Sequence, residues 1–327
     1  MKVVLLHNAD ALEPPVDPVL GQLELALEAE GHQVTRVSAG ESAKRLLADL
    51  TREEADLVFN LAESFAGKSA LESSVAALLN LLDLRYTGSS PAGLILAGDK
   101  TLTKKVLSFH KIRTARFATV YRGAVDWAED IKFPLILKPP QEDASLGITG
   151  KSVVNDVKEL LETMSSLQTE YQSPVLAEEF IDGREFYVGV LGNSNPRALP
   201  IIELDFSGFP QDRPRIASWA AKWGDDGEGK GEEFAGTKSI FPSNIDEELT
   251  TRIQQVAIDA FNALRLRDYA RVDLRMTEAG EIYVIEVNPN CYLEKKSEFA
   301  QAAKKDGLDY RSLINNIVEL AAARYSR

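Results

Sequence analysis

The sequence predicts an α/β protein that continues into α+β units, in two or three domains. Strand-like and helical segments alternate through the first third of the chain, which is the pattern of a parallel sheet covered by helices. The middle third changes to short strands around a smaller core, and the last third contains a strand pair with one polar face. With 327 residues, 44% apolar and 27% charged, the chain is long enough and apolar enough for several cores.

The first third alternates strands and helices. Its first helix follows Asp17, a residue type that caps helices, has Pro18 in its first turn and ends near Gly31. Parallel sheets bind ligands at the carboxyl ends of their strands, which here are residues 7–9 and 60–64. No GxGxxG follows the first strand, which excludes a dinucleotide-binding domain. The predicted order is strand 2–7, helix 17–31, strand 32–39, helix 41–50, strand 55–62, helix 69–82 and strand 84–88.

The middle third is predicted to be a small α+β unit. Its first helix begins after Gly98 and Asp99, and its second is capped by Asn155. A turn containing Gly183 joins the last two strands. The predicted order is helix 98–112, strand 115–121, strand 133–140, loop 141–148, strand 151–154, helix 155–167 and two strands within 174–192.

Four charged residues of this unit are candidates for nucleotide binding. Lys138 ends an apolar strand before a loop of small residues, where an ammonium group can meet a phosphate while loop N–H groups cradle its oxygens. Lys100 lies near a helix start, where positive charge gains nothing from the helix dipole. Glu178 and Glu185 flank a turn, and Glu185 is placed to accept ribose hydroxyls. A solvated surface side chain is the simpler alternative for each.

The segment YARVDLRMTEAGEIYVIEVNPN, residues 269–290, is predicted to be a hairpin with its turn at Gly280. Side chains alternate between the two faces of a strand, so a loop with an even number of residues fixes which residues oppose one another, and an odd loop breaks this register. The even loop predicts the pairs Asp273–Glu286 and Arg271–Asn288. The opposite face is predicted to be core and consists of Val272, Leu274, Ile285 and Val287.

The polar face of this hairpin is a candidate metal site. Like charges directly opposite one another destabilise a hairpin unless a cation lies between them. Oxygen-bearing side chains suit a hard cation such as Mg²⁺, which often shares its ligands with phosphate. An ordinary surface hairpin with a solvated polar face is the alternative.

Composition limits the partners and the compartment. The formal net charge of −13 argues against binding to nucleic acid or to an anionic membrane. No apolar run has transmembrane length, and the short apolar start lacks the features of a signal peptide. The single cysteine, Cys291, excludes an internal disulfide, and three scattered histidines form no metal motif. We therefore expect a cytoplasmic protein that acts on small molecules.

In their order, these features resemble the ATP-grasp superfamily and, within it, the D-alanine–D-alanine ligase family. YTGSSPAGLILAGDKTLTKKVL resembles the family's junction between its first two domains, LILKPPQEDASLGI its phosphate-binding loop, LAEEFIDGREFYVGVLG its adenine and ribose segment, and ARVDLRM with YVIEVNPN its metal hairpin. The resemblance covers nearly the whole chain. It implies a three-domain ATP-grasp fold with an N-terminal parallel α/β domain at 1–97, a central domain at 98–183 and a C-terminal domain at 184–327, with ATP between the last two.

The resemblance also assigns roles to matching residues. Arg271 would stabilise an oxyanion, Lys222 would reach the transferred phosphate from a lid loop, and Ser145 would contact the outer phosphates. The residues assigned to ATP are Lys100, Lys138, Ser145, Glu178, Phe180, Ile181, Glu185, Lys222 and Ile285. Those assigned to two Mg²⁺ ions, with Mn²⁺ as an alternative, are Asp273, Glu286 and Asn288. Those assigned to the carboxylate and amine substrates are Ser297, Asp17 and Glu63.

The implied reaction is stepwise. A carboxylate attacks the terminal phosphate of ATP to give an acyl phosphate, and an amine then displaces phosphate to form an amide. The alternatives are a true D-alanine–D-alanine ligase, an ATP-grasp kinase that stops at phosphorylating a hydroxyl, and an ATP-binding regulator without catalysis. The presence of all three expected metal ligands together with Arg271 argues against the regulator, since ATP binding alone requires no oxyanion donor.

Departures from the family pattern cluster where substrates would bind. The phosphate loop reads Asp143-Ala144-Ser145 in place of Gly-Ser-Ser. The stretch HNADALEPPVDPV lacks the family's Ser-x-Glu, which grips an amino group, and Tyr292 replaces the glycine of Ser-Pro-Gly. We therefore expect substrates other than a pair of D-alanines. The oligomeric state, a homodimer included, is left open by the sequence.

Overall fold

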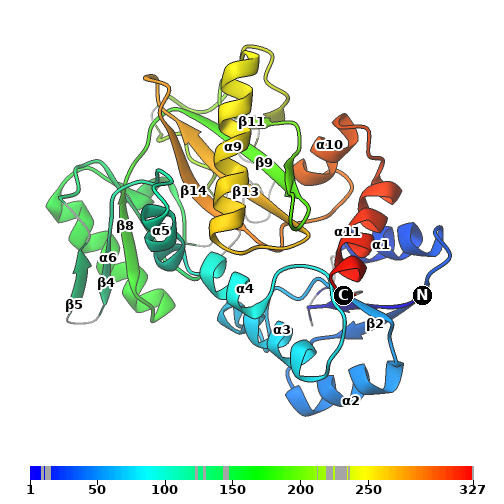
Figure 1. The fold of residues 1–327 in the computed structure, drawn as a ribbon. Helices are drawn as coiled ribbons and strands as arrows, with labels where there is room; N and C mark the ends of the chain where they lie inside the picture. Colours follow the sequence, from blue (N-terminus) through cyan, green and yellow to red (C-terminus); the bar gives the residue numbers. More distant parts are fainter. Residues whose placement is uncertain are drawn as a thin grey trace.

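The structure is a computed structural model that describes residues 1–8, 11, 16–121, 124–127, 130–142, 147–211, 213–218, 224, 234 and 236–325. Three sheets follow one another along the chain (Figure 1). The first lies within residues 1–97, the second within 98–183 and the third within 184–327. The predicted combination of a parallel α/β part with α+β parts is confirmed, and the domain boundaries stay a prediction.

The first sheet is parallel, as predicted, in the order β2-β1-β3. Its elements are β1 (Lys2–His7), α1 (Pro18–Glu28), β2 (Gln33–Ser38), α2 (Ala43–Glu53), β3 (Leu57–Asn60), η2 (Ser69–Leu71), α3 (Glu72–Leu81) and α4 (Pro91–Gly98). The predicted strand at 84–88 is wrong, because this segment pairs with β3 only at Val58–Tyr86. The chain turns away at Gly88, which has a φ of 87° and donates its N–H to Asp268, the residue before Tyr269 of the third sheet.

The second sheet is antiparallel, in the order β5-β4-β8-β6-β7. Its elements are α5 (Lys100–Phe109), β4 (Phe117–Tyr121), β5 (Ala124–Trp127), β6 (Leu135–Lys138), η3 (Gly150–Ser152), β7 (Val153–Val154), α6 (Val157–Tyr171) and β8 (Val175–Glu179). Lys138 ends β6, as expected from the sequence. The predicted cap Asn155 is wrong: α6 is capped by Asp156, whose carboxylate accepts the Glu159 N–H at 2.9 Å.

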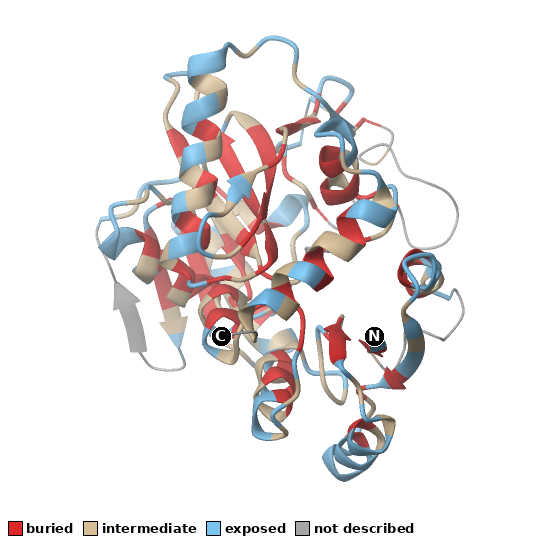
Figure 2. Cartoon of the chain, turned by 45° about the vertical axis from the view of Figure 1, so that its right-hand side comes forward, coloured by how far each residue is buried: buried red, intermediate tan, exposed pale blue. Residues whose placement is uncertain are grey.

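The third sheet is antiparallel, in the order β12-β11-β9-β13-β14, with β10 beside β9. Its elements are β9 (Arg184–Leu191), β10 (Arg197–Ala198), β11 (Ile202–Asp205), β12 (Lys238–Ile240), α9 (Glu247–Ala263), β13 (Tyr269–Met276) and β14 (Ile282–Asn288). Ile253 and Phe261 of α9 share a core with Val188 and Val272 of the sheet. β9 and β13 are almost wholly buried, whereas β12 at one edge of the sheet is exposed (Figure 2).

A β-bulge sets the register of the β13–β14 hairpin. Asp273 opposes Glu286, as predicted, although the loop is odd: Thr277 N donates to Glu281 O at 3.0 Å, which leaves three residues between them. A register shift after Asp273 makes Ile285 the extra residue and restores the pairing. The prediction that Ile285 belongs to the core face is wrong, because the bulge turns it into a cavity beside Glu286.

The end of the chain returns to the first sheet. After α10 (Glu298–Lys305), α11 (Tyr310–Arg324) packs beside α1 (Figure 1). Arg324 donates hydrogen bonds to Asp268 at 2.8 Å and to the carbonyl oxygen of Tyr86 at 2.7 Å. The first and third sheets therefore share one core, whose members include Leu5, Leu23, Tyr187, Tyr269, Phe299 and Ile317.

Candidate active site

Two cavities are lined by the β13–β14 hairpin. Arg271 and Asn288 line the larger one, of about 980 Å³, and Asp273 and Glu286 line the smaller one, of about 70 Å³. Arg271 opposes Asn288, and Asp273 opposes Glu286 two residues further along the strand. All four side chains share the polar face of the hairpin, so the two cavities adjoin there.

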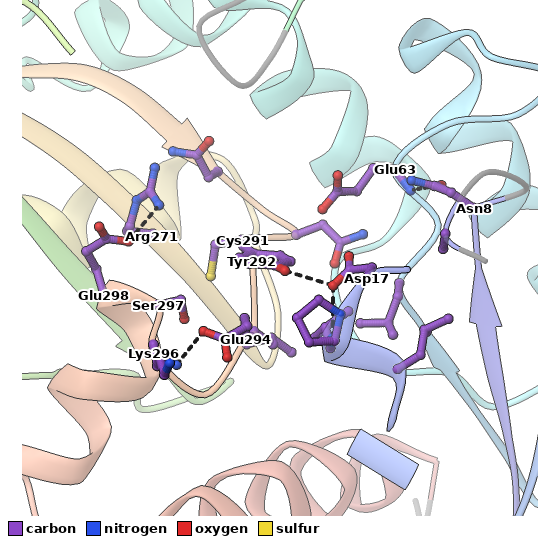
Figure 3. Close-up of a pocket in the computed structure, with 18 of the residues that line it drawn as sticks. Asn8, Asp17, Glu63, Arg271, Cys291, Tyr292, Glu294, Lys296, Ser297 and Glu298 are labelled. Carbon is purple, nitrogen blue, oxygen red and sulfur yellow. Dashed lines mark hydrogen bonds and ion pairs between the residues drawn. The ribbon is translucent and has the colours of Figure 1, made fainter. Parts of the chain in front are cut away.

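The larger cavity lies where the sequence predicts a ligand crevice. His7, Asn8, Leu61 and Glu63, at the carboxyl ends of β1 and β3, line one side of it. The start of α1 and the loop 289–297 line the rest, together with residues of the third sheet (Figure 3). The cavity is therefore built by the first sheet, the third sheet and the loop that follows β14.

The smaller cavity lies between the second and third sheets. β6 contributes Lys138 and β8 contributes Glu178, while β9 contributes Glu185. Ile285 enters the lining through the bulge. The complete described lining is Ile136, Lys138, Ile148, Glu178, Glu179, Phe180, Ile181, Glu185, Ile216, Ala217, Asp273, Arg275, Ile285 and Glu286.

The three candidate metal ligands are held by cations and by one another. Arg271 donates to both oxygens of Asp273, at 2.7 and 2.9 Å, and Asn288 Nδ2 donates to Asp273 Oδ2 at 3.2 Å. Lys100 Nζ lies 2.7 Å from Glu286 Oε1. Burial lowers the pKa of Arg271, but the charge of Asp273 outweighs it and raises the pKa well above its usual value, so Arg271 stays charged.

The donor set of this face fits Mg²⁺. Asp273, Glu286 and Asn288 offer two carboxylates and one amide oxygen, and Mg²⁺ takes oxygen ligands that it completes with phosphate and water. Among the described residues, no group of three histidine, cysteine or carboxylate side chains is placed to hold a metal. The oxygen ligands proposed at this site are therefore the two carboxylates and the amide of the hairpin, and Mg²⁺ commonly adds oxygens of phosphate or water to such a set.

Glu178 lies between two buried lysines. Its carboxylate forms ion pairs with Lys104 and Lys138, and all three side chains are at most 4% exposed. Burial alone would raise the pKa of Glu178, but the two ammonium groups outweigh it and lower the pKa. Sequence reasoning missed Lys104. The sequence feature that could have identified it is its position four residues after Lys100, which places both lysines on the same face of α5.

Arg275 is a second residue that sequence reasoning missed. It donates to Glu185 Oε2 at 2.7 Å and to Ile181 O at 2.8 Å, and its guanidinium lies 5.3 Å from the centre of the Phe180 ring. Arg275 thus organises three residues that were assigned to adenine and ribose. Strand parity was the available signal, since Arg275 follows Asp273 by two residues and shares its face.

The three candidate substrate residues all line the larger cavity. Glu63 lies at the end of β3, and Ser297 caps α10 by accepting the Ala300 N–H at 3.4 Å. Asp17 caps α1 and accepts a hydrogen bond from Tyr292 Oη at 2.8 Å. Figure 3 shows these groups around one space, with Tyr292 reaching toward Asp17.

Cys291 belongs to the wall of the larger cavity. Its side chain is 5% exposed, and burial raises the pKa of the thiol to about 12 despite the nearby charge of Arg271. A protonated thiol is a poor nucleophile. The cysteine therefore has a packing role.

Two candidate residues lie outside the described part of the chain. Ser145 falls within 143–146 and Lys222 within 219–223. Their assignments to phosphate stay predictions.

Comparisons with known proteins agree in the family they indicate. A family model described as D-ala D-ala ligase C-terminus matches residues 104–319. A protein of Sinorhizobium fredii, uncharacterized protein y4sG, is 32% identical, covering 95% of this chain and 89% of its own length. A D-alanine–D-alanine ligase of Desulfotalea psychrophila is 31% identical, covering 91% of this chain and 87% of its own.

The fold is similar to that of a solved structure. A D-alanine–D-alanine ligase from Bacillus anthracis, crystallised in complex with ATP, superposes with a TM-score of 0.75 over 99% of this chain and 98% of its own, at 22% identity. This likeness concerns the arrangement of the three sheets and the elements between them.

Proposed function

The chain belongs to the D-alanine–D-alanine ligase family and is an ATP-dependent ligase, and from this premise we propose that it joins a small carboxylate to a small amine in the larger cavity. One observation carries the proposal. Asp273 and Glu286 line the smaller cavity, while Arg271 and Asn288 of the same polar face line the larger. A phosphoryl group held at the first pair is adjacent to a carboxylate held at the second.

The smaller cavity is assigned to ATP. Phe180, Ile181 and Ile285 provide apolar surface, and Glu185 provides an acceptor for ribose hydroxyls. Glu178 with its two lysine partners carries a net positive charge, which favours phosphate. Lys100, Ser145 and Lys222 are assigned to the phosphates as well, on the family resemblance.

The smaller cavity must open to admit ATP. Its volume of about 70 Å³ is far below the ~300–1,000 Å³ typical of small-molecule sites. Its walls come from two different sheets, so separation of the second sheet from the third enlarges it without unfolding either. We therefore expect nucleotide binding to change the relative position of these sheets.

The metal ligands are Asp273, Glu286 and Asn288. When bound there, Mg²⁺ would neutralise charge on the triphosphate and reduce its repulsion of the attacking carboxylate. Arg271 remains charged and lines the larger cavity while its partner Asp273 lines the smaller one, so it is positioned to stabilise negative charge that develops on the acyl group.

The reaction proceeds in two displacements. A carboxylate oxygen of the first substrate bonds to the terminal phosphorus of ATP, and ADP leaves. The amine nitrogen of the second substrate then bonds to the acyl carbon, the carbon–oxygen bond to phosphate breaks, and phosphate and a proton are released. Both nucleophiles belong to substrates, so the chain contributes positioning and charge stabilisation.

The residues proposed to contact the substrates line the larger cavity. Asp17 and Glu63 are the candidate partners of a substrate ammonium group, and Ser297 is the candidate partner of the acceptor's carboxylate. A pair of D-alanines is the second candidate, favoured by the names of the relatives. We propose a different pair, because the Asp17 oxygen bonded to Tyr292 also caps α1, so part of the acceptor capacity of Asp17 is used within the protein.

One experiment tests the activity and separates it from its alternatives. Phosphate release is measured with ATP and Mg²⁺ across pairs of amino acids and dipeptides, and the products are identified by mass. With the active pair, an ¹⁸O label in the substrate carboxylate should appear in the released phosphate. A phosphorylated hydroxyl product formed together with ADP, without release of phosphate, would indicate a kinase, and ATP binding without turnover would indicate a regulator.

The proposed partners and compartment rest on the composition of the chain and on its use of ATP. No helix in the described part of the chain is long and apolar enough to cross a membrane. A cytoplasmic location is proposed from the use of ATP and from the single, buried cysteine. With a net charge of −13, small molecules rather than nucleic acids are the proposed partners.

A further inference from the structure

The loop that follows Asn288, residues 289–297, is tied across the larger cavity to α1. Tyr292 Oη donates to Asp17 Oδ1 at 2.8 Å. Gln22 of α1 makes two more hydrogen bonds to the loop, at 2.8 and 2.7 Å. This loop belongs to the C-terminal part of the chain, so these bonds connect two walls of the cavity that are distant in sequence.

Tyr292 is the exposed residue between two buried neighbours of the loop, all three of which line the cavity. Cys291 and Leu293, on either side of it, are 5% and 1% exposed and belong to the core shared by the first and third sheets. Tyr292 is 36% exposed and lines the cavity. Since its neighbours occupy the core, the ring cannot withdraw into it without displacing them.

Asp17 fixes the position of the Tyr292 hydroxyl. The same carboxylate oxygen accepts the Val19 N–H at 2.9 Å and so is held to the backbone of α1. Burial, together with the charge and hydrogen bond of Asp17, raises the pKa of Tyr292, which therefore remains a donor at neutral pH. The ring is thus anchored at both ends, by its own backbone and by Asp17.

The ring lies in the path of a substrate. In Figure 3, Tyr292 lies between Arg271 on one side and Asp17 on the other, with Asn8 and Glu63 beyond it. A substrate that reacts beside Arg271 and extends toward α1 must therefore pass along this ring. Because the cavity has a volume of about 980 Å³, at the upper end of the usual range for small-molecule sites, such a substrate need not be as small as alanine.

We propose that Tyr292 determines the size of the substrate group accepted between Arg271 and α1, and that Asp17 is its positioning residue. This proposal rests on the ligase function. It assigns the limit on substrate size to one side chain that touches the substrate and one that holds it in place. The substrate class is an amino acid or short peptide whose side chain lies against the aromatic ring.

Three variants test the role of the ring. Tyr292→Gly removes the ring, Tyr292→Phe keeps it but loses the bond to Asp17, and Tyr310→Phe is the matched control. Tyr310 Oη donates to Leu293 O of the same loop at 3.0 Å, but Tyr310 is not among the residues that line the cavity. The thermal unfolding midpoint of each variant shows whether it is folded.

The readout is kcat/KM across amino acids and dipeptides ordered by side-chain volume. Tyr292→Gly should raise kcat/KM for large substrates relative to kcat/KM for small ones by about tenfold or more. This is the scale on which a pocket discriminates small differences in size. Tyr292→Phe should change KM more than kcat, and Tyr310→Phe should keep the wild-type profile. An unchanged profile in a folded Tyr292→Gly variant would overturn the proposal, and if that variant does not fold, Tyr292→Leu takes its place.

A double-mutant cycle tests the positioning role of Asp17. In Asp17→Ser the hydroxyl still caps α1 but is too short to hold Tyr292. In that background Tyr292→Phe should have no further effect on the size profile, since the bond is already lost. Additive effects would overturn the role of Asp17. Turnover by the wild type with no change in any variant would overturn only this proposal, whereas absence of turnover with every substrate pair would overturn the ligase function as well.

Discussion

Lys100 Nζ lies 2.7 Å from Glu286 Oε1, so the lysine assigned to phosphate is paired with a carboxylate assigned to metal. The two side chains are 5% and 19% exposed. Arg271 pairs with Asp273 in the same way, at 2.7 Å. Each metal carboxylate therefore has a cation of the chain beside it, and an incoming metal ion competes with that cation.

The first prediction concerns this competition. Lys100→Met should strengthen binding of Mn²⁺ alone by about three- to tenfold, the effect of removing ~1 kcal/mol of ion pairing from Glu286. The same change should weaken binding of ATP, because a phosphate partner is lost. Calorimetric titration with Mn²⁺ and, separately, with ATP measures both effects. Lys105→Met, an exposed position on the same helix, is the control, and equal Mn²⁺ affinity in Lys100→Met and wild type would contradict the competition.

The second prediction concerns Glu286 itself. Glu286→Gln should reduce Mg²⁺-dependent ATP turnover by about 100-fold or more while the fold is kept, because a charged metal ligand is replaced by a neutral one. Turnover is measured over a Mg²⁺ titration. Glu281→Gln, at a half-exposed position of the same hairpin where the carboxylate pairs with Arg113, should leave turnover unchanged. Near-normal turnover of Glu286→Gln at limiting Mg²⁺ would show that the metal lies elsewhere.

The third prediction concerns stability and pH. Glu178→Gln leaves Lys104 and Lys138 without their buried counter-ion and should lower the free energy of unfolding by about 3–5 kcal/mol. Since the folded pKa of Glu178 is lowered, its contribution is present above the unfolded value of about 4.3 and is lost as pH falls through the folded pKa. Urea unfolding of the wild type and Glu178→Gln is measured at pH 7 and below pH 4. The difference between their free energies of unfolding should be smaller in acid. A constant difference would mean that Glu178 is not ionised in the folded protein.

The fourth prediction concerns D-alanine. With D-alanine as the sole substrate at millimolar concentration, phosphate release should barely exceed the release without substrate. The reason is that the Asp17 oxygen available at this site already accepts hydrogen bonds from Tyr292 and from the α1 backbone. Formation of D-alanyl-D-alanine at a rate well above that background would make the second candidate the function.

The fifth prediction concerns Cys291, the single cysteine of the chain. Because burial raises the pKa of its thiol to about 12, a disulfide reagent at pH 8 should react with it far more slowly in the folded protein than in guanidinium chloride. Absorbance of the released thiolate follows the reaction at one site. Equal rates in the two conditions would show that the wall of the larger cavity is open to the reagent.

Local sequence patterns predicted the parts of the site that depend on one strand or one turn. Parity identified the opposition of Asp273 and Glu286, and strand order identified the carboxyl ends that line the larger cavity. The predicted register required an even loop, yet the loop is odd and a bulge at Ile285 compensates for it. A bulge depends on pairing between strands and on packing, so composition alone gives no signal for it.

The remaining contacts join segments that are distant in sequence. Large sequence separations divide three of these pairs: 74 positions for Lys104–Glu178, 90 for Glu185–Arg275 and 275 for Asp17–Tyr292. Side-chain spacing identifies which residues share a face of one element, but not which element lies opposite. Those partners depend on how the sheets and helices pack against one another.

The position of α11 has a consequence for how the protein is made. The core of the first sheet includes Leu5 and Leu23 from the start of the chain and Ile314 and Ile317 from its end. A ribosome releases the first residues long before the last, so the first sheet emerges with part of its apolar surface uncovered. It cannot reach its final packing until α11 has left the exit tunnel. Nascent chains interrupted before residue 310 would therefore need a chaperone that covers this surface.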